Sequence, residues 1–148
     1  MVNRFANTIN KLPIMTTEKD YSKYTVLAVD DVPLNLILVE KILQRYNFKV
    51  KKANGGQEAL DMIAAEKPSL VLLDLMMPNV DGFDVLAALS KSEETSNIPV
   101  VILSALNSES DIEKALSNGA KDFVTKPILM DKLLNCILRT LGEEELPS

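Results

Sequence analysis

Short apolar runs alternate with longer amphipathic segments along residues 24–141. The apolar runs are rich in Val, Ile and Leu, which is typical of strands buried on both faces of a sheet. The segments between them place apolar residues three or four positions apart, as in Leu34, Ile37, Leu38 and Ile42, and this spacing predicts helices. We expect strands over residues 24–30, 48–53, 70–74, 100–105 and 122–125 and helices over residues 33–46, 55–68, 81–92, 108–120 and 128–141.

This alternation predicts an α/β domain. Strands joined through helices run parallel, and the helices then cover both faces of the sheet. We expect a doubly wound, five-stranded parallel sheet of the flavodoxin-like kind, with strand order 2-1-3-4-5. We divide the chain into a flexible N-terminal arm (residues 1–24), the domain (residues 25–142) and an acidic tail (residues 143–148).

Composition narrows the classes of function. The chain has 148 residues, of which 47% are hydrophobic, and a net charge of −5, which argues against direct nucleic-acid binding. It has no histidine, which excludes histidine catalysis, histidine metal ligands and a phosphohistidine of its own. No apolar run is long enough to span a bilayer, and the first residues do not read as a signal peptide, so we expect a cytoplasmic location. The single cysteine, Cys136, lies in an apolar helical pattern and reads as a packed thiol.

Polar side chains follow four of the five predicted strands. Asp30 and Asp31 end the first strand, Asp74 ends the third, Ser104 ends the fourth and Lys126 follows the fifth. In an open α/β sheet, ligands bind beyond the carboxyl ends of the strands, where the strand order reverses. In the expected order the reversal lies between the first and third strands, so three carboxylates share one crevice with a hydroxyl and an ammonium group.

Three clustered carboxylates need positive charge. A pair of like charges about 4 Å apart costs roughly 4 kcal/mol at an effective dielectric constant of about 20. Lys126 supplies one positive charge, and Mg²⁺ supplies two while favouring carboxylates, water and phosphate oxygens as ligands. The cluster therefore predicts a Mg²⁺ site that a phosphoryl group completes.

Four segments resemble the receiver domain of two-component response regulators, the CheY-like family. They are VLAVDDVPLN, LVLLDLMMPNVDG, VVILSA and DFVTKP, and the resemblance covers about residues 24–142. It implies a phosphorylation-dependent signalling switch rather than an enzyme with a free substrate. Asp74 would accept a phosphoryl group from a partner histidine kinase or phosphotransfer protein. The surface of the fourth helix, fifth strand and fifth helix would then change for a downstream protein target, with the chain a monomer or a phosphorylation-dependent dimer.

The resemblance also implies a metal-ligand set. Asp31 and Asp74 would bind Mg²⁺, Asp30 would act mainly through water, and the main-chain carbonyl of Met76 would be a further ligand. The phosphate lifetime in this family depends on two positions, occupied here by Met76 and Leu106. Because neither side chain can orient a water molecule by hydrogen bonding, we expect slow self-dephosphorylation.

The remaining roles implied by the resemblance concern the phosphoryl group and the switch. Ser104 and Lys126 would each bind a phosphoryl oxygen. Ser104 would also move when the phosphate arrives, together with Phe123 as an aromatic rotamer switch. The Lys126–Pro127 peptide would be cis, which proline makes accessible.

Three other functions share some of these features. A Mg²⁺-dependent aspartyl-phosphate phosphatase or phosphotransferase of the haloacid-dehalogenase kind would need an acid two residues after Asp74, where this chain has Met76. A flavodoxin-like flavin binder would need a phosphate-cradling loop in place of the acidic residues 30–33. A receiver-like scaffold that is never phosphorylated would not need an intact Asp74 and Lys126. Asn79 and Asp81 read as turn and cap residues rather than ligands.

Overall fold

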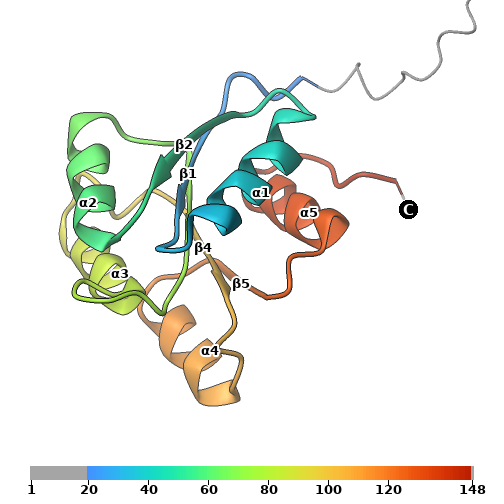
Figure 1. The fold of residues 1–148 in the computed structure, drawn as a ribbon. Helices are drawn as coiled ribbons and strands as arrows, with labels where there is room; N and C mark the ends of the chain where they lie inside the picture. Colours follow the sequence, from blue (N-terminus) through green and yellow to red (C-terminus); the bar gives the residue numbers. More distant parts are fainter. Residues whose placement is uncertain (1–19, 148) are drawn as a thin grey trace, which may run out of the picture.

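The computed structural model describes residues 20–147, and within them five strands alternate with five helices (Figure 1). This alternation confirms the predicted order of elements. The elements are β1 (Thr25–Val29), α1 (Pro33–Gln44), β2 (Lys49–Ala53), α2 (Gly56–Ala65), β3 (Leu70–Leu73), α3 (Gly82–Lys91), β4 (Val100–Ser104), α4 (Glu109–Ser117), β5 (Asp122–Thr125) and α5 (Met130–Thr140).

The strands form one parallel sheet in the order β2-β1-β3-β4-β5, as predicted. The register pairs Val29 of β1 with Leu73 of β3, so these two central strands end level with each other. The residues that follow them, Asp30 and Asp74, therefore leave the sheet side by side. The strand order reverses between β1 and β3, which is where this fold opens a crevice for ligands.

Helices cover both faces of the sheet. Helices α1 and α5 lie on one face, while α2, α3 and α4 lie on the other (Figure 1). Alternate strand residues serve the two layers: Ala28 and Leu72 pack toward α1 and α5, and Val29 and Leu73 pack toward α2, α3 and α4. Because both faces are buried, the strands are apolar throughout rather than alternating with polar residues.

The loop before α3 behaves as the turn and cap that its sequence predicts. Asn79 adopts a left-handed backbone conformation with φ of 65°. Asp81 is the N-cap of α3 and accepts a hydrogen bond from the Asp84 main-chain N–H, while the Asp84 side chain accepts one from the Asp81 N–H. This reciprocal capping box fixes where α3 begins, directly beside the end of β3.

The folded domain begins earlier than predicted. Tyr21 lies within the proposed flexible arm, but it is buried, stacks on Phe48 with ring centroids 4.9 Å apart, and donates its main-chain N–H to the Tyr46 carbonyl. The arm boundary at residue 24 is therefore wrong, because aromatic packing extends the domain to Tyr21. The rest of the predicted arm, residues 1–19, lies outside the described residues, as does residue 148.

The end of the described chain also contacts the domain. The Leu146 main-chain N–H donates to Asn135 Oδ1 at 2.8 Å, and Arg139 pairs with Glu145. Cys136 is buried as predicted, and its burial together with Asp122 raises the pKa of the thiol to about 12. Among residues 20–147, no helix combines the length and the apolar character needed to cross a membrane.

Candidate functional site

Three aspartates meet at the carboxyl end of the sheet. Asp30 and Asp31 follow β1, and Asp74 follows β3. Each offers a carboxylate oxygen, and these three oxygens lie within 4.8 Å of one another. Asp30 and Asp74 are buried, whereas Asp31 is exposed. The structure thus assembles the three acids that the strand-end argument placed together.

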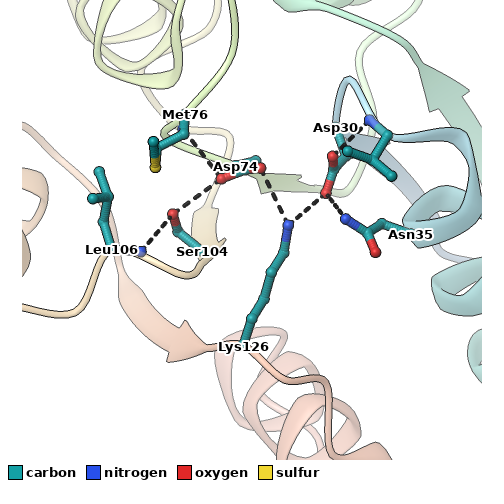
Figure 2. A network of polar contacts seen from close by, with 8 residues as sticks. Asp30, Asn35, Asp74, Met76, Ser104, Leu106 and Lys126 are labelled. Carbon is teal, nitrogen blue, oxygen red and sulfur yellow. Dashed lines mark hydrogen bonds and ion pairs between the residues drawn. The ribbon is translucent and has the colours of Figure 1, made fainter.

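The Asp74 carboxylate is held at both oxygens. Oδ1 accepts hydrogen bonds from the Ser104 hydroxyl at 3.0 Å and from the Met76 main-chain N–H at 3.1 Å (Figure 2). Oδ2 accepts from Lys126 Nζ at 3.2 Å. Ser104 is fully buried at the end of β4, and its hydroxyl donates to Asp74 rather than to solvent. These contacts orient the carboxylate and leave it facing the crevice.

Lys126 bridges two of the acids. Its Nζ lies 2.7 Å from Asp30 Oδ2 and 3.2 Å from Asp74 Oδ2. Burial disfavours the charged lysine, but the hydrogen bonds and negative charges of Asp30 and Asp74 outweigh burial and raise its pKa above the ordinary value. Lys126 therefore stays protonated. The peptide that follows it, Lys126–Pro127, is cis, which is the isomer that the resemblance implies.

The Asp30 carboxylate has three donors. Lys126 Nζ and Asn35 Nδ2 both donate to Oδ2, the latter at 3.1 Å, while the Val32 main-chain N–H donates to Oδ1 at 2.9 Å (Figure 2). Sequence reasoning did not single out Asn35. The available signal was a half-buried polar residue in the first turn of the helix that follows the acidic pair, two positions after Pro33.

Glycine is required where α3 approaches Asp74. A Cβ atom at Gly82 would lie 2.2 Å from the Asp74 carbonyl oxygen and 2.6 Å from the Leu75 Cα. Both are main-chain atoms, so a side chain there would force the backbone apart. The Gly82 N–H donates to the Leu75 carbonyl at 3.1 Å. The DG pair in the sequence thus lets α3 brace the loop that carries Asp74.

The other predicted site residues lie around this cluster. The side chains of Met76 and Leu106 lie on the Ser104 side of Asp74 (Figure 2), and both line an open groove of about 410 Å³. Met76 is exposed, and the Leu106 N–H donates to Ser104 Oγ at 3.3 Å. Phe123 lies half-buried on β5, paired with Ile102 of β4. Its role as a switch, like the carbonyl of Met76 as a ligand, stays a prediction.

The charges of the cluster suit a divalent cation. Three carboxylates and one ammonium group leave an excess of two negative charges. Within residues 20–147, Lys126 is the one cationic side chain that forms ion pairs with these acids. Carboxylate oxygens are the hard ligands that Mg²⁺ prefers, and the exposed Asp31 has direct access to solvent. The donor set therefore fits Mg²⁺.

Comparisons with known proteins agree with this geometry. Residues 26–138 match the family described as response regulator receiver domain. Protein PilH of Pseudomonas aeruginosa is 36% identical over 117 residues, which is 79% of this chain and 97% of PilH. Response regulator PleD of Caulobacter vibrioides is 43% identical over 103 residues, 70% of this chain, and the match spans only 23% of PleD.

Solved structures show the same fold. The chemotaxis protein CheY4 of Vibrio cholerae superposes with a TM-score of 0.75 at 26% identity, covering 79% of this chain and 98% of CheY4. The receiver domain of Francisella response regulator 1452 gives a TM-score of 0.75 at 30% identity, covering 80% of this chain and 97% of that domain. The CheY-like fold is thereby confirmed.

Proposed function

Because the chain belongs to the family of response regulator receiver domains, we propose that it acts as a phosphorylation-dependent signalling switch. Asp74 accepts a phosphoryl group from a phosphohistidine on a partner histidine kinase or phosphotransfer protein. An Asp74 carboxylate oxygen attacks phosphorus, the phosphorus–nitrogen bond breaks, and the partner's histidine keeps the electron pair. The product is an acyl phosphate on Asp74. Residues 1–148 contain no histidine, so the phosphohistidine that we propose as donor lies outside them.

The observation that carries this proposal is the set of donors around Asp74. A carboxylate is a weak nucleophile that depends on positioning, and phosphoryl transfer depends mainly on positioning and charge neutralisation. The Ser104 hydroxyl and Lys126 Nζ lie 3.0 and 3.2 Å from the Asp74 carboxylate. A phosphoryl group on Asp74 would find a hydroxyl donor and a cation beside it. These two residues are its proposed phosphoryl-binding partners.

The proposed direct ligands of Mg²⁺ are Asp31, Asp74 and the main-chain carbonyl of Met76. Asp30 is proposed to act through water. When bound, Mg²⁺ would neutralise negative charge on the incoming phosphoryl group. The residues of the chain supply the rest: Asp74 attacks, Lys126 neutralises charge, and Ser104 donates a hydrogen bond. The local excess of two negative charges supports this assignment.

The consequence of phosphorylation is a change in the surface formed by α4, β5 and α5. A phosphoryl dianion on Asp74 would attract Ser104, the last residue of β4, and Lys126, which directly follows β5. The chain at the ends of both strands would then shift. Phosphorylation generally acts by biasing a loop or helix that has two arrangements. We assign Ser104 and Phe123 as the residues that change position between these two arrangements. A downstream protein target would read this surface in the cytoplasm, with the chain a monomer or a phosphorylation-dependent dimer.

A signalling switch is better supported than a hydrolytic enzyme as the function of this site. A phosphatase that uses the same aspartyl chemistry needs a general acid near the nucleophile. Met76 stands two residues after Asp74, and its side chain carries no proton to transfer. The groove on that side of Asp74 is lined mainly by apolar side chains, including Met76, Phe83 and Leu106. These features favour retention of the phosphate rather than turnover.

The test is intact-mass spectrometry after incubation with Mg²⁺ and acetyl phosphate. We expect one added phosphoryl group of about 80 Da on the unmodified chain and none on the Asp74→Asn variant. Asp61→Asn, which changes an exposed acid on α2, is the matched control and should take up phosphate normally. An adduct that persists in Asp74→Asn would overturn the assignment of Asp74 as acceptor.

A further inference from the structure

We propose that Asn35 is a positioning residue for the phosphoryl-transfer site, acting through Asp30. The inference rests on the proposed function and adds a residue to it. Asn35 Nδ2 donates to Asp30 Oδ2 at 3.1 Å, the same oxygen that accepts from Lys126 Nζ at 2.7 Å. Asn35 and Lys126 therefore share one acceptor atom, and the strength of one contact affects the other.

The contact with Asn35 completes a two-point attachment of Asp30 to the start of α1. Oδ1 accepts from the Val32 main-chain N–H at 2.9 Å, and Oδ2 accepts from Asn35 Nδ2. Val32 is the N-cap residue of this helix, and Asn35 lies in its first turn. Val32 makes no side-chain capping bond. The Asp30 carboxylate instead accepts a hydrogen bond from the main-chain N–H of Val32 at this end of the helix. The attachment fixes both carboxylate oxygens without using Lys126.

This arrangement lets Lys126 serve two acceptors in turn. In the unphosphorylated site, Lys126 bridges Asp30 and Asp74. A phosphoryl group on Asp74 needs the lysine, and a buried carboxylate oxygen left without a hydrogen-bond donor costs free energy. Asn35 keeps a donor on Asp30 Oδ2 when Lys126 turns toward the phosphoryl oxygens. Asp30 then stays in place beside the metal ligands.

An amide is suited to this task because it is neutral. A lysine or arginine at position 35 would reduce the local excess of negative charge from two to one and so weaken the attraction for a divalent cation. Asn35 donates a hydrogen bond and leaves the charge unchanged. Partners that orient metal-site carboxylates in this way typically affect metal affinity or activity by about 10- to 100-fold.

The main test is a Mg²⁺ titration of the full chain without phosphodonor, by calorimetry or by ¹H–¹⁵N NMR. Asn35→Ala should raise the Mg²⁺ dissociation constant about tenfold. Leu34→Ala, which changes an exposed neighbour on the same helical turn, is the matched control and should leave it unchanged. With acetyl phosphate as donor, Asn35→Ala should shift the Mg²⁺ concentration for half-maximal rate more than it lowers the rate at saturating Mg²⁺.

A second measurement records the NMR signals of the Asn35 side-chain amide itself, with Asn35 left unchanged. In the metal-free chain, NMR signals of the Asn35 side-chain amide should be those of a hydrogen-bonded group, and Asp30→Ala should shift them to values of a solvated amide. Amide signals that do not respond to Asp30→Ala would overturn the inference, even if Asn35→Ala failed to fold.

The titration separates this inference from the proposed function. Weaker Mg²⁺ binding in Asn35→Ala would support the role of Asn35 even if Asp74 took up no phosphate. If Asp74 is phosphorylated normally and Asn35→Ala binds Mg²⁺ as tightly as the unmodified chain, the role of Asn35 is overturned alone. Failure of the unmodified chain to bind Mg²⁺ would overturn it as well.

Discussion

The two ends of the sheet differ in the side chains that they bury: charged groups at the carboxyl end and aromatic rings at the amino end. At the carboxyl end, Asp30, Asp74 and Lys126 are charged and largely buried. At the amino end, where the chain enters β1 and β2, Tyr21 stacks on Phe48, and the Tyr24 ring lies 6.2 Å from Phe48. One end concentrates charge that must be compensated, and the other concentrates apolar area that stabilises the fold directly.

The difference indicates where stability and function reside. Burying charged groups costs free energy that their mutual attraction only partly recovers, so the carboxyl end contributes little to stability and suits the proposed phosphoryl transfer. Burying aromatic rings is favourable in itself. Substitutions at the amino end should therefore change stability without changing the reaction, whereas substitutions at the carboxyl end should affect both, in a manner that depends on Mg²⁺.

The largest effect on stability is expected at the amino end. Phe48→Ala removes a ring that is 3% exposed and contacts the rings of Tyr21 and Tyr24, so the free energy of unfolding should fall by about 4 kcal/mol. Chemical denaturation measures this loss. Leu116→Ala, an exposed apolar position on α4, is the control. A phosphorylation rate by acetyl phosphate that fell in the folded Phe48→Ala variant would contradict the separation of the two ends.

The next effect is at the carboxyl end. Lys126→Met leaves Asp30 and Asp74 as neighbouring buried carboxylates without their cation, so the free energy of unfolding in the presence of a chelator should fall by about 3 kcal/mol. Mg²⁺ at the proposed site should recover part of this loss, because a ligand that binds the folded state and not the unfolded chain stabilises the fold. Phe48→Ala should show no such selective recovery.

Chemical denaturation of Lys126→Met in chelator measures the loss in free energy of unfolding, and denaturation in Mg²⁺ measures how much of it is recovered. Lys121→Met, at an exposed lysine just before β5, is the matched control. If Lys126→Met were as stable as the unmodified chain in chelator, the cluster would not need its lysine for charge compensation. The contrast between the two ends would then be wrong.

The smallest effect concerns the lifetime of the phosphate rather than stability. Met76 and Leu106 line the groove beside Asp74 and cannot orient a water molecule. The Met76→Gln, Leu106→Gln double variant adds groups able to do so. One new hydrogen bond in the transition state is worth about 1 kcal/mol, so acyl-phosphate decay should accelerate roughly fivefold. Decay is followed by intact-mass spectrometry, and an unchanged lifetime would contradict the prediction that the apolar groove slows self-dephosphorylation.

Much of the fold was predictable because its signals are local. The apolar runs and the helical spacing between them defined ten elements in the observed order. The acids at the ends of β1 and β3 also pointed to one crevice, because parallel strands with level ends bring the following residues together. The arm boundary was predicted wrongly because Tyr21 is ordered by Phe48, a contact across 27 positions that no local pattern reveals.

Sequence alone therefore determined the strand–helix alternation and the acidic cluster with its lysine, while the role of Asp74 as phosphoryl acceptor stays a proposal. Only the tertiary structure decided how those side chains share their hydrogen bonds: Lys126 between Asp30 and Asp74, Ser104 on Asp74, and Asn35 on Asp30. Periodicity and strand-end position are properties of neighbouring residues. Which donor reaches which oxygen depends on the relative placement of β1, α1, β3, β4 and the segment after β5, which is settled only when the two core layers pack.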